Sequence, residues 1–271
     1  MTSDVSFSDL GVRAPLVSSL AGRGIAAPFP IQVSTLPDTL AGRDVLGRGR
    51  TGSGKTLAFS IPLVSRLVDA PRRPSRPSGL VLAPTRELAL QVGDVFTHLG
   101  YPLKLKVAVV YGGVSINPQM MGLRGGADIV VATPGRLLDL VDHNAVQLKD
   151  LQHLVLDEAD RLLDLGFAEE LQRILALLPA QRQNLLFSAT FEPAVHTLAE
   201  ALLSDPARIT IAQTQAHTPD IAQRAIQVDE KSRTALLRHL IKTHAWKRVL
   251  VFVATRYACE HVANKLYKAG V

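Results

Sequence analysis

The chain has 271 residues, of which 47 % are hydrophobic, and a net charge of +6, so it can bury a sizeable core. No apolar run approaches the roughly 18 to 20 residues that span a bilayer, and Asp4 and Asp9 do not fit a secretory signal, so we expect a cytoplasmic protein with no membrane partner. A single cysteine, Cys259, excludes an intrachain disulfide, and no Cys/His spacing resembles a zinc site.

Short apolar runs alternate with longer segments of helical periodicity through residues 1–211. The runs lack polar alternation, as is typical of parallel strands buried on both faces. We therefore expect a doubly wound α/β domain. The expected strands are 44–46, 80–82, 107–110, 129–131, 154–156, 184–187 and 209–211, and the clearest helical segments are 57–68, 87–99 and 167–178.

The polar segment 212–219 has no hydrophobic period and is interpreted as an interdomain linker. Strands at 225–228 and 249–253 and helices at 232–243 and 257–269 are expected after it, with Cys259 as a buried thiol on the last helix. Two strands and two helices are too few to close an independent core of this type. Residues 220–271 are therefore expected to be an incomplete second domain.

All of the excess positive charge lies in this C-terminal part. Residues 212–271 hold ten Lys/Arg and four Asp/Glu, whereas residues 1–211 hold twenty of each. A basic balance favours a polyanionic partner, but on charge alone a solvated helix surface is the stronger interpretation.

A glycine-rich loop at 49–56, Gly-Arg-Thr-Gly-Ser-Gly-Lys-Thr, matches the phosphate-loop pattern between an expected strand and helix. Glycines allow a tight turn in which main-chain N–H groups and the helix N-terminus face an anion. Lys55 is expected to reach the β- and γ-phosphates, and Thr56 to give its hydroxyl to Mg²⁺. The flanking elements disfavour a chance turn, so the predicted nucleotide-binding residues here are Thr51, Gly52, Ser53, Gly54, Lys55 and Thr56.

Two carboxylates follow the expected strand 154–156, at the edge where open α/β sheets bind ligands. We expect Asp157 to position Mg²⁺ and Glu158 to orient or deprotonate the water that attacks the γ-phosphate. Without other motifs, an Asp-Glu pair after an apolar run is more often the solvated start of a helix than a metal site. The phosphate loop earlier in the chain makes the metal site the better interpretation here. The predicted catalytic residues are Glu158, Asp157 and Lys55.

The run Asp157-Glu158-Ala159-Asp160 resembles the motif of DEAD-box ATP-dependent RNA helicases of superfamily 2, bacterial type. Other segments are similar to further motifs of that family, in the same order along the chain. The region of about residues 5–33, with Phe7, Gly24-Ile25, Pro28 and Pro30-Ile31-Gln32, resembles its adenine-sensing Q motif. The resemblance implies that Gln32 hydrogen-bonds the base and that Phe7 stacks on it.

Three further segments resemble the family's RNA-contacting blocks, and each follows an expected strand: 84–88, with Pro84, Thr85 and Arg86 as its predicted contact residues; Gly112 and Gly113; and Thr133, Pro134, Gly135 and Arg136. The resemblance implies RNA contacts that carry little sequence information. Without it, the Pro-Thr and Thr-Pro-Gly segments are more simply explained as strand-to-helix turns with N-caps.

The segment Ser188-Ala189-Thr190 resembles the block that couples hydrolysis to strand separation through Asp160. A nucleophilic Ser188 is disfavoured because no G-x-S-x-G elbow surrounds it. Residues 249–256 resemble the first nucleic-acid block of the family's second domain.

The resemblance implies a RecA-like P-loop domain, with a mostly parallel sheet flanked by helices, plus the start of a second RecA-like domain. It also implies ATP as substrate, Mg²⁺ as cofactor, RNA and ribonucleoprotein complexes as partners, and a monomer. Gly49 departs from the family, which more often has alanine there, and the later blocks that supply an arginine finger are absent, so we expect weak hydrolysis by this piece. The alternatives are an ATP-gated RNA clamp without unwinding and a DNA helicase of the same superfamily.

Overall fold

The computed structural model describes residues 5–71, 73–211 and 221–270. The chain divides into two units, Met1–Ala212 and Gln213–Val271, which are treated separately. The segment 212–219, predicted to be a linker, lies outside the described residues. Within the described ranges, no helix combines the length and the apolar character that crossing a bilayer requires.

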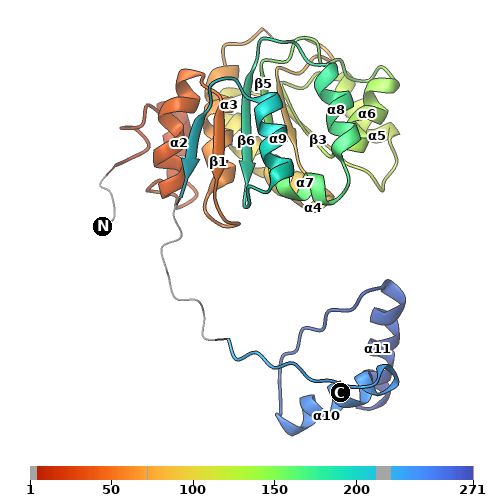
Figure 1. Cartoon of the computed structure of the whole chain (residues 1–271). Coiled ribbons are helices and arrows are strands. Elements are labelled where there is room, and N and C mark those ends of the chain that lie inside the picture. Colours follow the sequence, from red (N-terminus) through yellow and green to blue (C-terminus); the bar gives the residue numbers. More distant parts are fainter. Residues whose placement is uncertain (1–4, 72, 212–220, 271) are drawn as a thin grey trace. The chain divides into compact units, whose positions relative to one another are not determined.

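A seven-stranded sheet forms the centre of the first unit (Figure 1), and all six pairings between its strands are parallel. This confirms the predicted α/β fold with its mostly parallel sheet. The spatial order is β3-β4-β2-β5-β6-β1-β7. The strands are β1 Val45–Arg48, β2 Gly79–Leu82, β3 Val107–Val110, β4 Ile129–Ala132, β5 His153–Leu156, β6 Gln183–Ser188 and β7 Ala207–Thr210.

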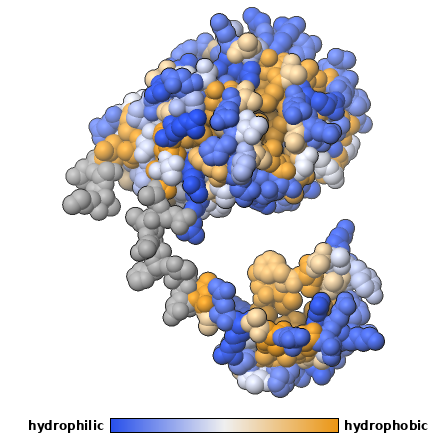
Figure 2. Space-filling model, in the orientation of Figure 1, coloured by the Kyte–Doolittle hydropathy of each residue, from blue (hydrophilic) through white to orange (hydrophobic). Residues whose placement is uncertain are grey.

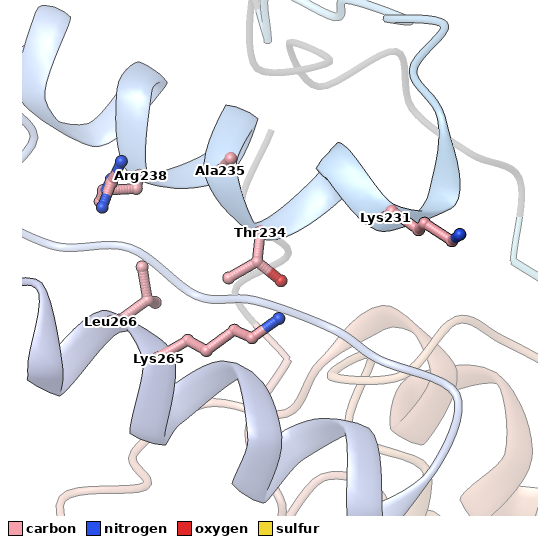
Figure 3. A pocket seen from close by; sticks show the side chains of 6 residues that line it. All are labelled: Lys231, Thr234, Ala235, Arg238, Lys265 and Leu266. Atoms are coloured by element: carbon pink, nitrogen blue, oxygen red, sulfur yellow. The ribbon is translucent and has the colours of Figure 1, made fainter.

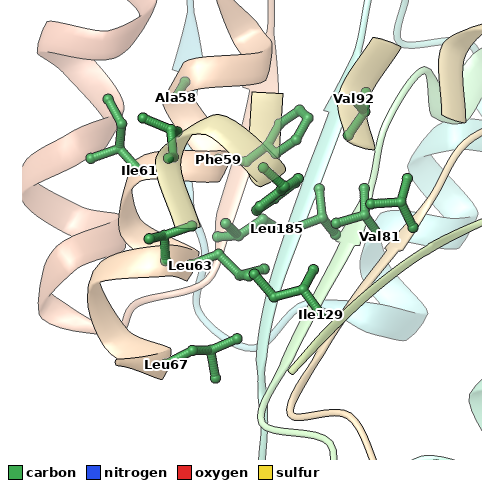
Figure 4. Close-up of a cluster of buried hydrophobic side chains, with 14 of the residues drawn as sticks. Ala58, Phe59, Ile61, Leu63, Leu67, Val81, Val92, Ile129 and Leu185 are labelled. Carbon is green, nitrogen blue, oxygen red and sulfur yellow. The ribbon is translucent and has the colours of Figure 1, made fainter. Parts of the chain in front are cut away.

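Helices cover both faces of the sheet, and two hydrophobic cores lie between them and the strands. Successive strand residues point to opposite faces, so Val155 joins one core while Leu154 and Leu156 join the other. Figure 4 shows the first core, where Phe59 and Leu63 pack among strand residues. The helices are α1 Ala14–Ala21, α2 Pro30–Ala41, α3 Lys55–Leu67, α4 Arg86–Gly100, α5 Asn117–Arg124, α6 Pro134–Asp142, α7 Ala159–Asp164, α8 Ala168–Ala176 and α9 Pro193–Leu202, with a 3₁₀ turn η1 at Tyr101–Leu103.

The expectation that every strand is buried on both faces is confirmed for the centre of the sheet and wrong for its edges. All residues of β2, β4, β5 and β6 are buried. In the edge strand β7, Ala207 and Ile209 are half-buried against the first core while Arg208 and Thr210 are exposed, because helices cover only one face of this strand.

The second unit contains η2 Glu230–Ser232, α10 Arg233–Thr243 and α11 Arg256–Lys268. The two predicted strands there are wrong: 225–228 and 249–253 have no regular structure, because no described segment pairs with them. Neither helix has a buried residue, so Cys259 lies on a helix as predicted but is exposed rather than buried. Figure 2 shows hydrophobic residues on the surface of this unit, where Leu250 and Phe252 are largely exposed.

Candidate functional site

The carboxyl ends of β1, β2 and β5 surround a cavity of about 580 Å³. Parallel strands release their connecting loops at the same edge of the sheet, which is why segments distant in sequence meet here. The structure thereby brings the predicted phosphate loop and the predicted acidic pair to one cavity. Its lining residues are Phe29, Thr51, Gly52, Gly54, Lys55, Thr56, Thr85, Glu87, Leu88, Gln91, Asp157, Glu158 and Arg161.

The loop between β1 and α3 has the conformation that its glycines permit. Gly52 and Gly54 have φ of +82° and +89°, and a Cβ on Gly54 would lie 2.5 Å from Nε2 of Gln32. Because α3 begins at Lys55, its unpaired N–H groups lie beside the cavity. The Lys55 side chain is buried, and its Nζ donates to the carbonyl of Gly49 at 2.6 Å. The loop therefore offers a cation and free main-chain donors to an anion.

The acidic pair is buried beside that loop. Burial raises the pKa of Asp157 to about 7; the positive charge of Lys55 opposes the shift and the carboxylate of Glu158 adds to it. A cation bound beside Asp157 would favour its ionised form and so oppose this rise in pKa. Thr56 and Asp157 carry a hydroxyl and a carboxylate, which are oxygen groups of the kind that Mg²⁺ prefers as ligands. Among the described residues, no group of three or more His, Cys, Asp or Glu could hold a metal ion. Mg²⁺ usually keeps several waters and takes substrate phosphates as ligands, so two protein oxygens fit its requirement.

Glu158 occupies the N-cap position of α7 in a left-handed conformation, with φ of +49°, and its side chain makes no capping hydrogen bond. Its main-chain N–H donates to Oδ1 of Asp157 at 3.0 Å, and its carboxylate accepts a hydrogen bond from Arg161 at 2.8 Å. Arg161 lines the cavity, but our sequence reasoning did not identify it. The other cavity residues that it missed are Phe29 and Gln91, whereas Glu87 and Leu88 belong to the segment 84–88 that resembles an RNA-contacting block.

Neither of the two predicted base-binding residues is among those that line the cavity. The Gln32 amide is buried; its Oε1 accepts from Phe29 N and its Nε2 donates to the Gly54 carbonyl, both at 2.9 Å. It therefore joins the start of α2 to the phosphate loop. Phe7 is only 2 % exposed and packs in the first hydrophobic core, so its ring is not available for stacking in this structure. The aromatic residue that lines the cavity is Phe29.

The three predicted coupling residues meet beside this site. The Asp160 carboxylate accepts hydrogen bonds from Thr190 N at 2.9 Å and Thr190 Oγ1 at 3.0 Å, and the Asp160 N–H donates to Ser188 Oγ at 3.3 Å. Burial alone would raise the pKa of Asp160, but hydrogen bonds led by those of Thr190 hold it below its usual value. The motif after β5 is thus tied to the segment after β6.

The three predicted RNA blocks follow β2, β3 and β4, which are neighbours in the sheet. Gly112 and Gly113 are exposed. Thr85 caps α4 by accepting from Leu88 N at 3.2 Å, so the N-cap interpretation also applies to it. The Arg86 guanidinium lies over the Tyr111 ring, 4.8 Å from its centre.

Arg136 does not present its guanidinium to the surface. The residue is only 8 % exposed, and its Nη2 donates to the Val114 carbonyl at 2.7 Å. It therefore joins the block after β4 to the loop after β3. Pro84, Thr133 and Pro134 are also buried, whereas Gly135 is half-buried.

The second unit has a separate small cavity of about 190 Å³ along α10 and α11 (Figure 3). Its lining includes Lys231, Arg238 and Lys265 and no acidic residue. Three of the basic residues that give 212–271 its excess positive charge thus line one cavity.

Comparison with known proteins gives concordant matches. Residues 29–198 match the DEAD/DEAH box helicase family. The chain is 40 % identical over 269 residues to "ATP-dependent RNA helicase DeaD" of Mycobacterium tuberculosis, covering 99 % of this chain and 47 % of that protein. It is 38 % identical over 268 residues to the Escherichia coli K12 protein of the same name, covering 98 % and 42 %. The chain thus spans about half the length of these relatives.

A solved structure is similar as well. It is described as "Crystal structure of hypothetical ATP-dependent RNA helicase from Sulfolobus tokodaii". The TM-score is 0.67 at 34 % sequence identity, over 73 % of this chain and 56 % of that one. This likeness agrees with a RecA-like fold for the parallel sheet.

Proposed function

Since the chain belongs to the DEAD/DEAH box helicase family, we propose that it is the nucleotide-binding part of an ATP-dependent RNA helicase. The observation that carries this proposal is one cavity whose lining includes both Lys55 and Thr56 and the acidic pair Asp157 and Glu158. A triphosphate there meets main-chain donors at the start of α3, and the Lys55 ammonium exchanges the Gly49 carbonyl for a phosphate oxygen.

Mg²⁺, held by Thr56 and Asp157, would neutralise charge on the β- and γ-phosphates. Glu158 accepts a proton from the attacking water, and main-chain donors of the phosphate loop stabilise the transferred group. The Q-motif segment supports nucleotide binding through the bonds of Gln32 to Phe29 and Gly54.

Single-stranded RNA would bind along the exposed blocks that follow β2 and β3, mainly through its backbone. Gly112, Gly113 and Arg86 suit this role because they are exposed at one edge of the sheet. The link from Asp160 to Thr190 supports coupling between the nucleotide site and the RNA site, since Asp160 lies only two residues after Glu158. ATP and RNA would then both bind one conformation of the protein more tightly than the other, so each would favour the conformation that binds its partner ligand. Acting in the cytoplasm as a monomer, the protein would unwind short duplexes or remodel ribonucleoproteins.

ATP hydrolysis with and without single-stranded RNA tests this function. We expect RNA to stimulate hydrolysis by the full-length protein, and Glu158→Gln to abolish turnover while ATP binding persists. The 271-residue chain should hydrolyse ATP more slowly than a version extended through a complete second domain. Turnover that survives in Glu158→Gln would remove Glu158 from its proposed role. Stimulation by single-stranded DNA as strong as by RNA would favour the DNA helicase alternative, and ATP turnover without strand separation would favour the clamp.

A further inference from the structure

Glu158, the proposed general base, is held by a single cation. Oε2 of its carboxylate accepts from Nη1 of Arg161 at 2.8 Å. The Glu158 side chain is 10 % exposed and the Arg161 side chain 56 % exposed, so a buried acid is paired with a cation at the edge of the cavity. Within the described part of the chain, the Glu158 carboxylate accepts no other hydrogen bond.

The backbone around this ion pair is well anchored. Glu158 is the N-cap residue of α7 and Arg161 lies in the first turn of that helix, three residues later in the sequence. The Arg161 N–H donates to Oδ1 of Asp160 at 3.0 Å, while Oδ2 of Asp160 binds Thr190. The position of Arg161 is therefore linked to the coupling segment after β6.

The pairing leaves Oε1 of Glu158 without a hydrogen-bond partner among the described residues. A general base needs a free lone pair within reach of the proton that it removes. Holding one carboxylate oxygen while the other stays free meets that need, and it limits rotation of the Glu158 side chain.

We propose that Arg161 is a positioning residue for ATP hydrolysis, holding Oε2 of Glu158 so that Oε1 is directed at the attacking water. The inference rests on the proposed function, because it assumes Glu158 as the base. Arg161 acts through Glu158 rather than as a phosphate ligand, since its described contact in the cavity is with that carboxylate. Its loss should therefore slow turnover without weakening nucleotide binding.

The test measures RNA-stimulated kcat and KM, together with ATP affinity, in the full-length protein. For Arg161→Ala we expect kcat to fall roughly tenfold or more, part of the 10²- to 10⁴-fold that positioned acid–base groups contribute, with ATP affinity within about twofold. Arg161→Lys should recover much of kcat because it restores a cation. Steady-state turnover is lost in Glu158→Gln, but single-turnover conditions measure its small residual rate, and in that background Arg161→Ala should cause no further loss.

Arg173→Ala is the matched control, because Arg173 is 61 % exposed and pairs with Asp142 at 3.6 Å away from the cavity. It should leave kcat unchanged. The inference is overturned if Arg161→Ala keeps full kcat, if it weakens ATP binding as strongly as it lowers kcat, or if it slows Glu158→Gln further. Full turnover by Glu158→Gln, or no ATPase in the wild-type protein, would instead overturn the proposed function itself.

Discussion

Oδ2 of Asp160 accepts hydrogen bonds from both the main-chain nitrogen and the hydroxyl of Thr190, at 2.9 and 3.0 Å. These bonds join the segments that follow two adjacent strands, β5 and β6. Since Asp160 lies two residues after Glu158, a displacement of the Thr190 segment would be transmitted to the site of hydrolysis.

Thr190→Val removes the hydroxyl bond and keeps the main-chain bond, so we expect partial uncoupling. In the full-length protein, the amount of duplex unwound per ATP hydrolysed should fall several-fold while ATP affinity stays unchanged. Thermal denaturation should show a loss of about 1 kcal/mol, the usual value of one hydrogen bond. Thr190→Ser, which keeps the hydroxyl, is the control and should couple normally; an unchanged unwinding yield in Thr190→Val would contradict this role.

Gln32→Ala tests whether the amide supports the phosphate loop as well as the base. It removes the bonds to Phe29 N and Gly54 O, so we expect weaker binding of ATP and also of inorganic triphosphate, which has no base. Isothermal titration with both ligands measures the two effects. Gln91→Ala, which alters a glutamine that lines the cavity itself, should leave triphosphate binding nearly intact. Normal triphosphate affinity in Gln32→Ala would show that Gln32 contributes only to recognition of the base and not to support of the phosphate loop.

Arg136→Ala should destabilise the first unit by about 2 kcal/mol, because it leaves the Val114 carbonyl without its donor and opens a cavity. RNA affinity should fall with it, through loosening of the loop that contains Gly112 and Gly113. Chemical denaturation and RNA titration measure the two quantities. The exposed Arg124→Ala is the control for loss of charge. A loss of RNA affinity at unchanged stability would instead indicate that Arg136 contacts RNA directly.

His153 should make stability depend on pH. Burial lowers its pKa to about 4; the charge of Arg66 adds to the shift and the hydrogen bond with Gln183 opposes it. The folded state therefore keeps the ring neutral while the unfolded chain binds a proton below about pH 6.5, so stability falls as the pH falls from 6.5 towards 4. Between pH 7 and pH 5 this amounts to about 2 kcal/mol.

Urea denaturation of the wild type and of His153→Gln at these two pH values checks the prediction. The variant should lose much of the pH dependence. An exposed histidine replaced in the same way, His143→Gln, should keep it. Equal pH dependence in the wild type and His153→Gln would show that the ring is not responsible.

The strands of the first unit were predictable because a strand buried on both faces needs an apolar run, as in 154–156. The phosphate loop and the acidic pair were predictable because each is contiguous in sequence and each follows a strand. The absence of a strand at 249–253 was not predictable from its apolar run, because a strand requires a partner and none of the described segments pairs with it.

Side-chain directions were also beyond sequence reasoning. Phe7 and Arg136 lie in motifs that the sequence indicates, but whether a ring or guanidinium faces the core or a ligand depends on the packing of neighbouring elements. Arg161 was missed because an arginine after an acidic motif is common on solvated helices. Only the distance to Glu158 distinguishes it.

The position of a bound nucleotide tests the central claim most directly. A crystal structure with Mg²⁺ and a non-hydrolysable ATP analogue should place the phosphates on the loop 51–56, with Lys55 Nζ moved from the Gly49 carbonyl to a phosphate oxygen and Asp157 beside the metal. A nucleotide bound elsewhere, or one bound while Lys55 stays on Gly49 and Asp157 touches neither metal nor its waters, would contradict the account.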